Sequence, residues 1–85
     1  MEDIIIDTLR ERSIKISSKR AWIVHEICAI QTIHDIELFW ISLRQKQPVS
    51  WATVHSTLRL LYRNGFLQKT PIGSRSFSYH LIAAA

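Results

Sequence analysis

The segment from Pro48 to Gly65 constrains this chain most, because both ends of a helix can be read from it. Ser50 is placed to cap the helix N-terminus, since its hydroxyl can accept a hydrogen bond from a free N–H of the first turn. Gly65 can adopt the left-handed conformation that closes a helix, and Phe66 after it can then contact Leu61. The segment therefore predicts one complete helix with both ends specified.

The two faces of this predicted helix differ in chemistry. Apolar residues recur at helical spacing on the face that a core would cover: Val54, Leu58 and Leu61. The opposite face carries polar and basic side chains and no carboxylate: His55, Ser56, Arg59 and Arg63. A helix with an apolar back and a basic, hydrogen-bonding front suits the major groove of DNA. An ordinary solvated helix face has the same pattern, so the two interpretations stay open at this point.

The length and the charge distribution narrow the class of protein. Residues 1–85 are enough for a single domain with one core. The net charge is +4, and all seven carboxylates lie at or before Glu37, whereas six lysines and arginines follow that residue. A basic half of this kind favours a polyanionic partner such as nucleic acid. The alternative is a basic surface that keeps the protein in solution.

Several other classes of function have little support. Cys28 is the only cysteine, which fits a reducing cytoplasm without disulfides. His25 and Cys28 share a helix face, but no second pair with ligand spacing accompanies them, so we expect no metal and no other cofactor. The chain has no nucleophile motif and no glycine-rich phosphate loop, and we do not expect an enzyme. We also expect no signal peptide and no membrane span, because no apolar run approaches the ~20 residues that a span needs.

Three further helices are predicted before Pro48: one over residues 2–12, one over about 18–30, and one that begins at His34 or Asp35 and ends at about Gln45. Ser17 or Ser18 is placed to cap the second of them. The core face of that second helix should comprise Ile23, Ile27 and Ile30. The core face of the third should comprise Ile36, Phe39, Trp40 and Leu43.

Beyond Gly65 the apolar pattern becomes alternating, which predicts a hairpin of two strands. The first strand covers residues 66–70, and the segment from Thr70 to Gly73 suits a type I turn with proline in its second position. The inward-facing residues of the second strand should be Phe77, Tyr79 and Leu81.

The connection between the third and fourth helices is short. Pro48 prevents the third helix from continuing, so the chain turns almost directly into the next helix. Two helices joined this closely are the helix-turn-helix arrangement, and a basic hairpin after them forms a wing. We therefore predict a mainly α fold with a small β-hairpin, namely a winged helix-turn-helix of three to four helices plus the wing.

Two stretches resemble the ferric uptake regulator family of repressors. Ile14-Lys-Ile-Ser-Ser-Lys-Arg20 is similar to the segment that opens the second helix in that family. Val49-Ser-Trp-Ala-Thr-Val-His-Ser-Thr-Leu-Arg-Leu-Leu-Tyr-Arg-Asn-Gly-Phe66 is similar to its recognition helix, whose usual form is S-L-A-T-V-Y-R-T-L followed by A-G or N-G. The resemblance covers about residues 9–82, the family's N-terminal DNA-binding domain. It implies a bacterial, cytoplasmic repressor domain that binds double-stranded DNA and regulates transcription.

Three departures bear on what the resemblance implies. His55 stands where the family has tyrosine and Ser56 where it has arginine, both on the face that reads DNA. The metal-sensing histidines before the third helix are not reproduced, since Thr32 falls near that place and His34 is offset. The printed chain also ends where the family's metal-binding dimerisation domain would begin. Two interpretations stay open: an isolated DNA-binding domain, or a natural protein without the sensor.

The candidate DNA-binding residues follow from the resemblance and the basic half. Arg59 is placed to reach a base edge and Arg63 to reach a phosphate. Lys15 and Arg20 correspond to family positions that approach DNA, where we expect phosphate contacts. The other candidates lie in the recognition helix and the wing: Trp51, Thr53, His55, Ser56, Lys69 and Arg75.

The alternative function is a winged-helix protein–protein interaction module that has lost DNA binding. Its contact surface would include Trp51, His55 and Ser56. The absence of the family's arginine at Ser56 favours this alternative, whereas the retained basic half favours DNA. A lone domain of the DNA-binding kind usually gains affinity by pairing, so a homodimer or a partner protein is also open.

Overall fold

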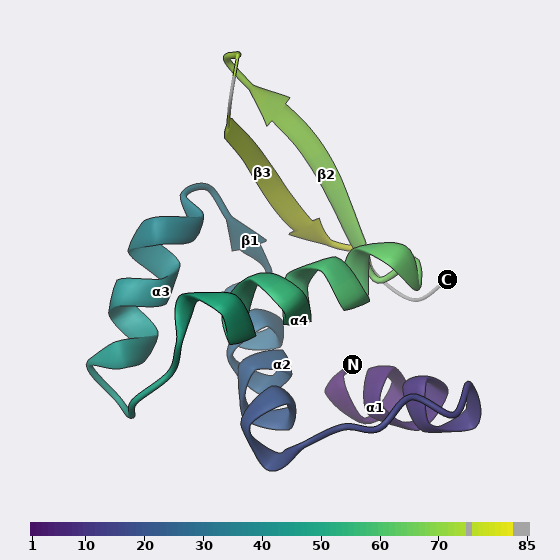
Figure 1. Cartoon of the computed structure of the whole chain (residues 1–85). Coiled ribbons are helices and arrows are strands. Elements are labelled where there is room, and N and C mark those ends of the chain that lie inside the picture. Colours follow the sequence, from purple (N-terminus) through teal and green to yellow (C-terminus); the bar gives the residue numbers. More distant parts are fainter. Residues whose placement is uncertain (75, 83–85) are drawn as a thin grey trace.

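The computed structural model describes residues 1–74 and 76–82. These residues form four helices and a three-stranded antiparallel sheet (Figure 1). In chain order the elements are α1 (Glu2–Glu11), α2 (Ser18–Ile30), β1 (Thr32–Ile33), α3 (Ile36–Arg44), α4 (Trp51–Arg63), β2 (Leu67–Ile72) and β3 (Ser76–Leu81). The structure confirms the predicted fold class, which is mainly helical with a small antiparallel sheet.

The sheet has the order β1-β3-β2, so the last strand of the chain lies in the middle. Strands β2 and β3 form a hairpin whose pairing runs from Leu67 opposite Leu81 to Ile72 opposite Ser76. The hairpin projects away from the helices (Figure 1). Strand β1 was not predicted, because two residues inside a connection are too few for an alternating pattern. Its residue Ile33 is nevertheless buried and pairs with Tyr79.

The helix starts are where the sequence places them, and a side chain caps three of the four. Ser17 Oγ accepts a hydrogen bond from the Arg20 N–H, which settles the choice between Ser17 and Ser18. Asp35 caps α3 by accepting two backbone N–H bonds, and Ser50 caps α4 by accepting one from Thr53. These bonds satisfy donors that a helix start leaves without partners.

Helix α4 ends as its sequence predicts. Gly65 has a φ of +85°, the left-handed conformation that a Cβ would penalise. The Phe66 N–H donates to the Leu61 carbonyl at 2.9 Å, and the Gly65 N–H donates to the Tyr62 carbonyl at 3.2 Å. This pair of bonds is the Schellman motif, which satisfies the last carbonyls of the helix. Both ends of α4 are therefore fixed by hydrogen bonds within the chain.

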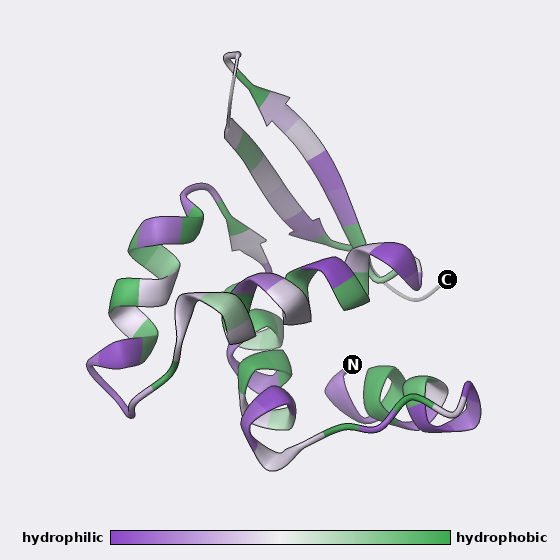
Figure 2. Ribbon diagram, in the orientation of Figure 1, coloured by the Kyte–Doolittle hydropathy of each residue, from purple (hydrophilic) through white to green (hydrophobic). Residues whose placement is uncertain are grey.

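The buried apolar residues form one cluster contributed by all four helices and the sheet. The members with almost no exposed surface include Ile5, Leu9, Ile23, Ile27, Leu43, Leu58 and Leu61. Coloured by hydropathy, each helix carries both hydrophilic and hydrophobic residues, as expected for helices that bury only one face (Figure 2).

Some predicted core positions are wrong. Ile30 is 47% exposed, because the last turn of α2 lies at the surface, where Ile30 and Leu38 line a shallow depression. Phe77 is 40% exposed. Phe77 lies near the tip of the projecting hairpin. Its ring packs against the Lys69 ammonium and not against the core. On α3, the predicted core residues Ile36 and Trp40 are half-buried and do pack against the core cluster.

The predicted turn from Thr70 to Gly73 is also misplaced. Strand β2 continues through Pro71, which pairs with Phe77, and the chain turns after Ile72. Gly73 has a φ of +68° and therefore belongs to the turn. A proline fits inside this strand because β2 is an edge strand with one neighbour only.

Candidate nucleic-acid interface

Helix α4 presents a stripe of residues to solvent opposite the face it buries. Its buried residues are Val54, Thr57, Leu58 and Leu61. The residues on the opposite side, which recur at helical spacing, are Ala52, Ser56, Arg59 and Arg63. We call these four residues the α4 stripe. All of them are exposed except Ser56, which is half-buried.

The two arginines of the α4 stripe have no ionic partner in the part of the chain that is described. The ion pairs found there are His25 with Glu2 and Lys46 with Glu26, both away from the stripe. The positive field of Arg59 reaches the hairpin. Burial raises the pKa of the Tyr79 hydroxyl, and the nearby Arg59 acts in the opposite direction. An unpaired arginine on a rigid helix is free to bind an external anion or a base edge.

Arg20 reaches the α4 stripe from another helix. It lies in the first turn of α2, and its Nη2 donates a hydrogen bond to Ser56 Oγ at 3.0 Å. The Ser56 hydroxyl donates in turn to the Thr53 carbonyl at 3.1 Å. The structure thus brings together three of the predicted site residues, although Arg20 and Ser56 are 36 positions apart.

Lys15 and Thr53 lie beside this contact. Together with Ser17, Lys19 and Arg20 they line an open depression of about 390 Å³ between the start of α2 and the start of α4. Lys15 is exposed in the segment that precedes α2. Thr53 is half-buried, and its hydroxyl is within hydrogen-bonding distance of Ser50 Oγ at 2.8 Å. Its side chain therefore belongs to the cap of α4 as well as to the candidate surface.

Lys19 has a structural position that the sequence does not reveal. Its Nζ donates to Gln47 Oε1 and to the Pro48 carbonyl, both at 2.8 Å. The ammonium therefore ties the start of α2 to the connection between α3 and α4. No local pattern could have predicted these bonds, because their partners lie 28 and 29 residues away.

Trp51 and His55 lie on the side of α4 that faces the hairpin. Trp51 is 38% exposed, and its ring packs edge-on against Trp40 with the centroids 5.4 Å apart. The His55 ring lies 4.9 Å from the Trp51 ring. Trp40 is held by a hydrogen bond from its Nε1 to the Val49 carbonyl at 3.0 Å. Both candidate residues are thus supported by aromatic packing as well as by the helix.

Lys69 of the hairpin is held against two aromatic rings. Its Nζ lies 4.1 Å from the Phe77 ring centroid and 5.5 Å from that of Tyr62. Such cation–π contacts hold an ammonium in place without neutralising its charge. Tyr62 was not among the predicted site residues. Its spacing from Trp51 and His55, which places the three on one side of the helix, is the signal that could have found it.

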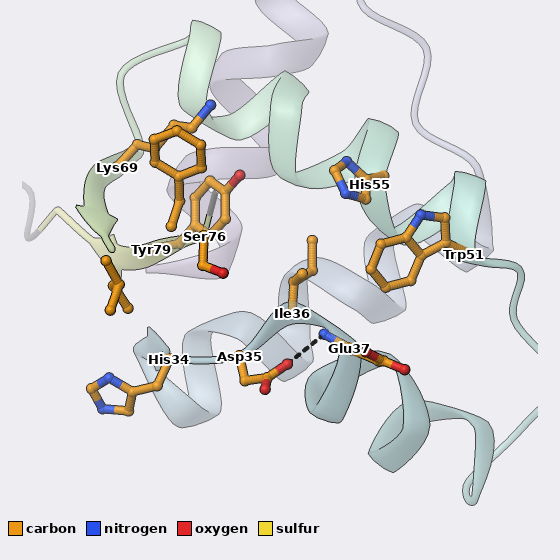
Figure 3. A pocket seen from close by; sticks show the side chains of 11 residues that line it. His34, Asp35, Ile36, Glu37, Trp51, His55, Lys69, Ser76 and Tyr79 are labelled. Atoms are coloured by element: carbon orange, nitrogen blue, oxygen red, sulfur yellow. Dashed lines mark hydrogen bonds between the residues drawn. The ribbon is translucent and has the colours of Figure 1, made fainter. Parts of the chain in front are cut away.

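A groove of about 620 Å³ opens between the start of α3, the start of α4 and the hairpin (Figure 3). Trp51 and His55 line one side, Lys69 and Tyr79 another, and Ile36 lies between them. The α3 side also contributes the carboxylates of Asp35 and Glu37. Asp35 is engaged in capping α3, because its Oδ1 accepts from two backbone N–H groups. The predicted wing residue Arg75 lies outside the described residues.

The described residues contain no group of three or more histidine, cysteine or acidic side chains that could hold a metal ion. His25 Nδ1 contacts Glu2 Oε1 at 2.6 Å. Burial raises the pKa of the Cys28 thiol, which disfavours the thiolate that acts as a metal ligand or nucleophile.

Comparisons with known proteins identify no relative: no family model, no curated protein and no solved structure matches this chain. Over residues 1–74 and 76–82, none of the helices is both long enough and apolar enough to cross a membrane.

Proposed function

We propose that this chain is a winged helix-turn-helix domain that binds double-stranded DNA and acts as a transcriptional regulator. In this proposal α3 and α4 are the helix-turn-helix, α4 is the recognition helix, and the hairpin β2–β3 is the wing. The observation that carries it is the α4 stripe, whose two arginines are exposed. Neither α4 nor the hairpin contains a carboxylate that would repel phosphate.

The shape of α4 supports this proposal. A helix of 13 residues is about 20 Å long, and the major groove, about 12 Å wide, admits a helix of this diameter. Because Ser50 and Gly65 fix both ends, the stripe is presented without fraying of the terminal turns. Lys15 lies near Thr53 on one side of the stripe and Lys69 near Tyr62 on the other. In this proposal both lysines would bind phosphates beside the DNA major groove.

The family part of the proposal follows the resemblance. The chain would be similar to the DNA-binding half of ferric uptake regulator repressors, working in the cytoplasm without the metal-sensing dimerisation domain. His55 and Ser56 replace the family's tyrosine and arginine, so we expect a different target sequence. The proposal includes neither a metal nor another cofactor, and it leaves open whether a homodimer or a partner protein adds affinity.

The test is a titration of random duplex DNA at two salt concentrations, followed by fluorescence anisotropy or mobility shift. With about five phosphate contacts, the slope of log K against log salt should be roughly −4 to −5. Between 50 and 200 mM salt the affinity should therefore fall roughly 250- to 1,000-fold. This loss is the largest effect that we expect for the chain.

The Arg63→Ala variant provides the matched control. It removes one expected phosphate contact and should make the slope shallower by about one. Arg63 is exposed, so the variant should keep the fold. A flat salt response, or no binding at low salt, would contradict the proposal.

A second candidate function is a protein-interaction module. It is favoured by the groove between α4 and the hairpin, which is lined by three exposed apolar side chains, Trp51, Ile72 and Phe77. Half-exposed aromatic residues are common at protein interfaces. The same titration separates the two candidates, because a module that has lost DNA binding would leave random duplex unbound at low salt.

A further inference from the structure

Arg20 is a cation of α2 whose guanidinium lies on a surface built by α4. The segment around it predicts a phosphate contact, like that of Lys15. The structure instead places Nη2 3.0 Å from Ser56 Oγ, and Ser56 belongs to the α4 stripe. Arg20 therefore adds a guanidinium at a position of the stripe where α4 itself carries only a hydroxyl.

Three contacts hold Arg20 in this position. The Arg20 backbone N–H donates to Ser17 Oγ at 3.2 Å, which orders the first turn of α2. The Ser56 hydroxyl donates a hydrogen bond to the Thr53 carbonyl, so the Ser56 oxygen can accept the hydrogen bond from Arg20. Helices α2 and α4 also pack against each other and contribute residues such as Ile23 and Leu58 to the same core cluster. Arg20 is half-buried, and its hydrogen bond to Ser56 positions the guanidinium before any ligand arrives.

Most of the hydrogen-bonding capacity of Arg20 remains free. A guanidinium has about five N–H donors in a fixed fork, and the contact with Ser56 uses one of them. Neither ion pair found among the described residues involves Arg20. A fork with two parallel donors fits the O6 and N7 acceptors of guanine, which is the commonest specific contact in the major groove. A lysine at the same position would carry the positive charge but not the two parallel N–H donors.

We propose that Arg20 is a specificity-determining residue that reads a guanine in the major groove, with Ser56 as the residue that positions it. This inference rests on the proposed DNA-binding function. It assigns to Arg20 a base contact instead of the phosphate contact that its place in the sequence predicts. Phosphate contacts add affinity to every sequence alike, whereas a base contact adds it only to the right one.

The experiment begins by selecting preferred sites for the unaltered protein from a random duplex pool. Affinities of the variants are then measured on the selected duplex and on random duplex at one salt concentration. Arg20→Lys keeps the charge, so it should bind random duplex within about twofold of the unaltered protein. It should lose about 10-fold or more on the selected duplex, the loss of one bidentate guanine contact.

Two variants complete the design. Ser56→Ala removes the hydroxyl that positions Arg20 and should lower affinity for the selected duplex by a smaller factor, with little change on random duplex. Lys15→Ala is the control for a phosphate contact and should lower the affinity for both duplexes by the same factor. Single base-pair changes in the selected site should show one guanine whose preference is strong in the unaltered protein and weak in Arg20→Lys. Circular dichroism melts verify that each variant is folded.

The outcomes distinguish this inference from the proposed function. If the unaltered protein binds no duplex at low salt, the proposed function fails and the role of Arg20 fails with it. If the unaltered protein binds DNA and Arg20→Lys changes the affinity for both duplexes by the same factor, the inference alone is overturned. Arg20 is then a phosphate contact like Lys15.

Discussion

The cations around α1, α2 and α3 differ from the arginines of the α4 stripe in whether they have binding partners within the protein. Around α1, α2 and α3 several cations have hydrogen-bonding or ionic partners within the protein. Arg12 donates to Asn64 Oδ1, Lys19 to Gln47, and Lys46 pairs with Glu26, each at 2.8 Å. On α4 the exposed arginines of the stripe form no ion pair with any of the residues that the structure describes. The first group joins elements that are distant in the sequence, and the second faces solvent.

This contrast teaches that basic residues in one chain serve two different purposes. Lys19 and Arg20 are neighbours in the sequence, yet the first fastens the connection before α4 and the second reaches the α4 stripe. A cation engaged mainly by intramolecular partners, such as Lys19 or Lys46, stabilises the fold, and losing it should change stability more than binding. Arg20 differs from them, because its one side-chain hydrogen bond to Ser56 leaves most of its donors free for a ligand. A cation without such partners contributes little to stability, and losing it should change binding alone.

The largest effect of a single substitution should come from the solvent-facing group. Arg59→Ala should cost about 1–3 kcal/mol of binding free energy on a selected duplex and much less on random duplex, because it removes a base contact. The free energy of unfolding should stay within about 0.5 kcal/mol of the unaltered protein, as for other exposed positions. Anisotropy titrations and chemical denaturation measure the two quantities. Equal losses on both duplexes would make Arg59 another phosphate contact.

The paired group should behave in the opposite way. Lys46→Ala leaves the Glu26 carboxylate, whose side chain is only 12% exposed, without its partner. Because Lys46 itself is largely exposed, the loss of unfolding free energy should be about 1 kcal/mol. Affinity for random duplex should change less than in Arg63→Ala. If Lys46→Ala weakened DNA binding as much as Arg63→Ala at unchanged stability, the division between the two groups would be wrong.

The smallest effect concerns an exposed pair between α1 and α2. The hydrogen bond with Glu2, and then the charge of Glu2, raise the pKa of His25 above its ordinary value near 6.5. A histidine whose pKa is higher in the folded state than in the unfolded state stabilises the fold when it is protonated. This contribution to the free energy of unfolding is fully present at pH values below the unfolded-state pKa, and it is lost as the pH rises through the folded-state pKa. The melting temperature should therefore fall slightly from pH 6 to pH 8.5. The effect should be small because the His25 side chain is 60% exposed.

Two variants that remove the same contact test this sign. His25→Gln and Glu2→Gln should each flatten the dependence of the melting temperature on pH, and by similar amounts. Thermal melts followed by circular dichroism at the two pH values suffice. A melting temperature that rises with pH in the unaltered protein and not in these variants would contradict the assignment.

Local signals in the sequence predicted much of the fold and only part of the site. Ser17, Ser50 and Gly65 act on neighbouring backbone groups, so the helix ends could be placed from the sequence. Strand β1 and the exposure of Ile30 depend on which elements cover them, and no local pattern carries that information. Among the site residues, the stripe of α4 followed from helical spacing. The contact between Arg20 and Ser56 did not, because it forms only when α2 and α4 pack together.

The Pro71 position in β2 has a consequence for how copies of this protein meet. Strand β2 is an edge strand on a hairpin that stands away from the body of the molecule, the kind of surface that can recruit a strand from another chain. A proline offers no N–H to such a strand, and the neighbouring Lys69 adds charge to the same stretch. Both features reduce the tendency of the exposed hairpin to pair with a strand of another chain.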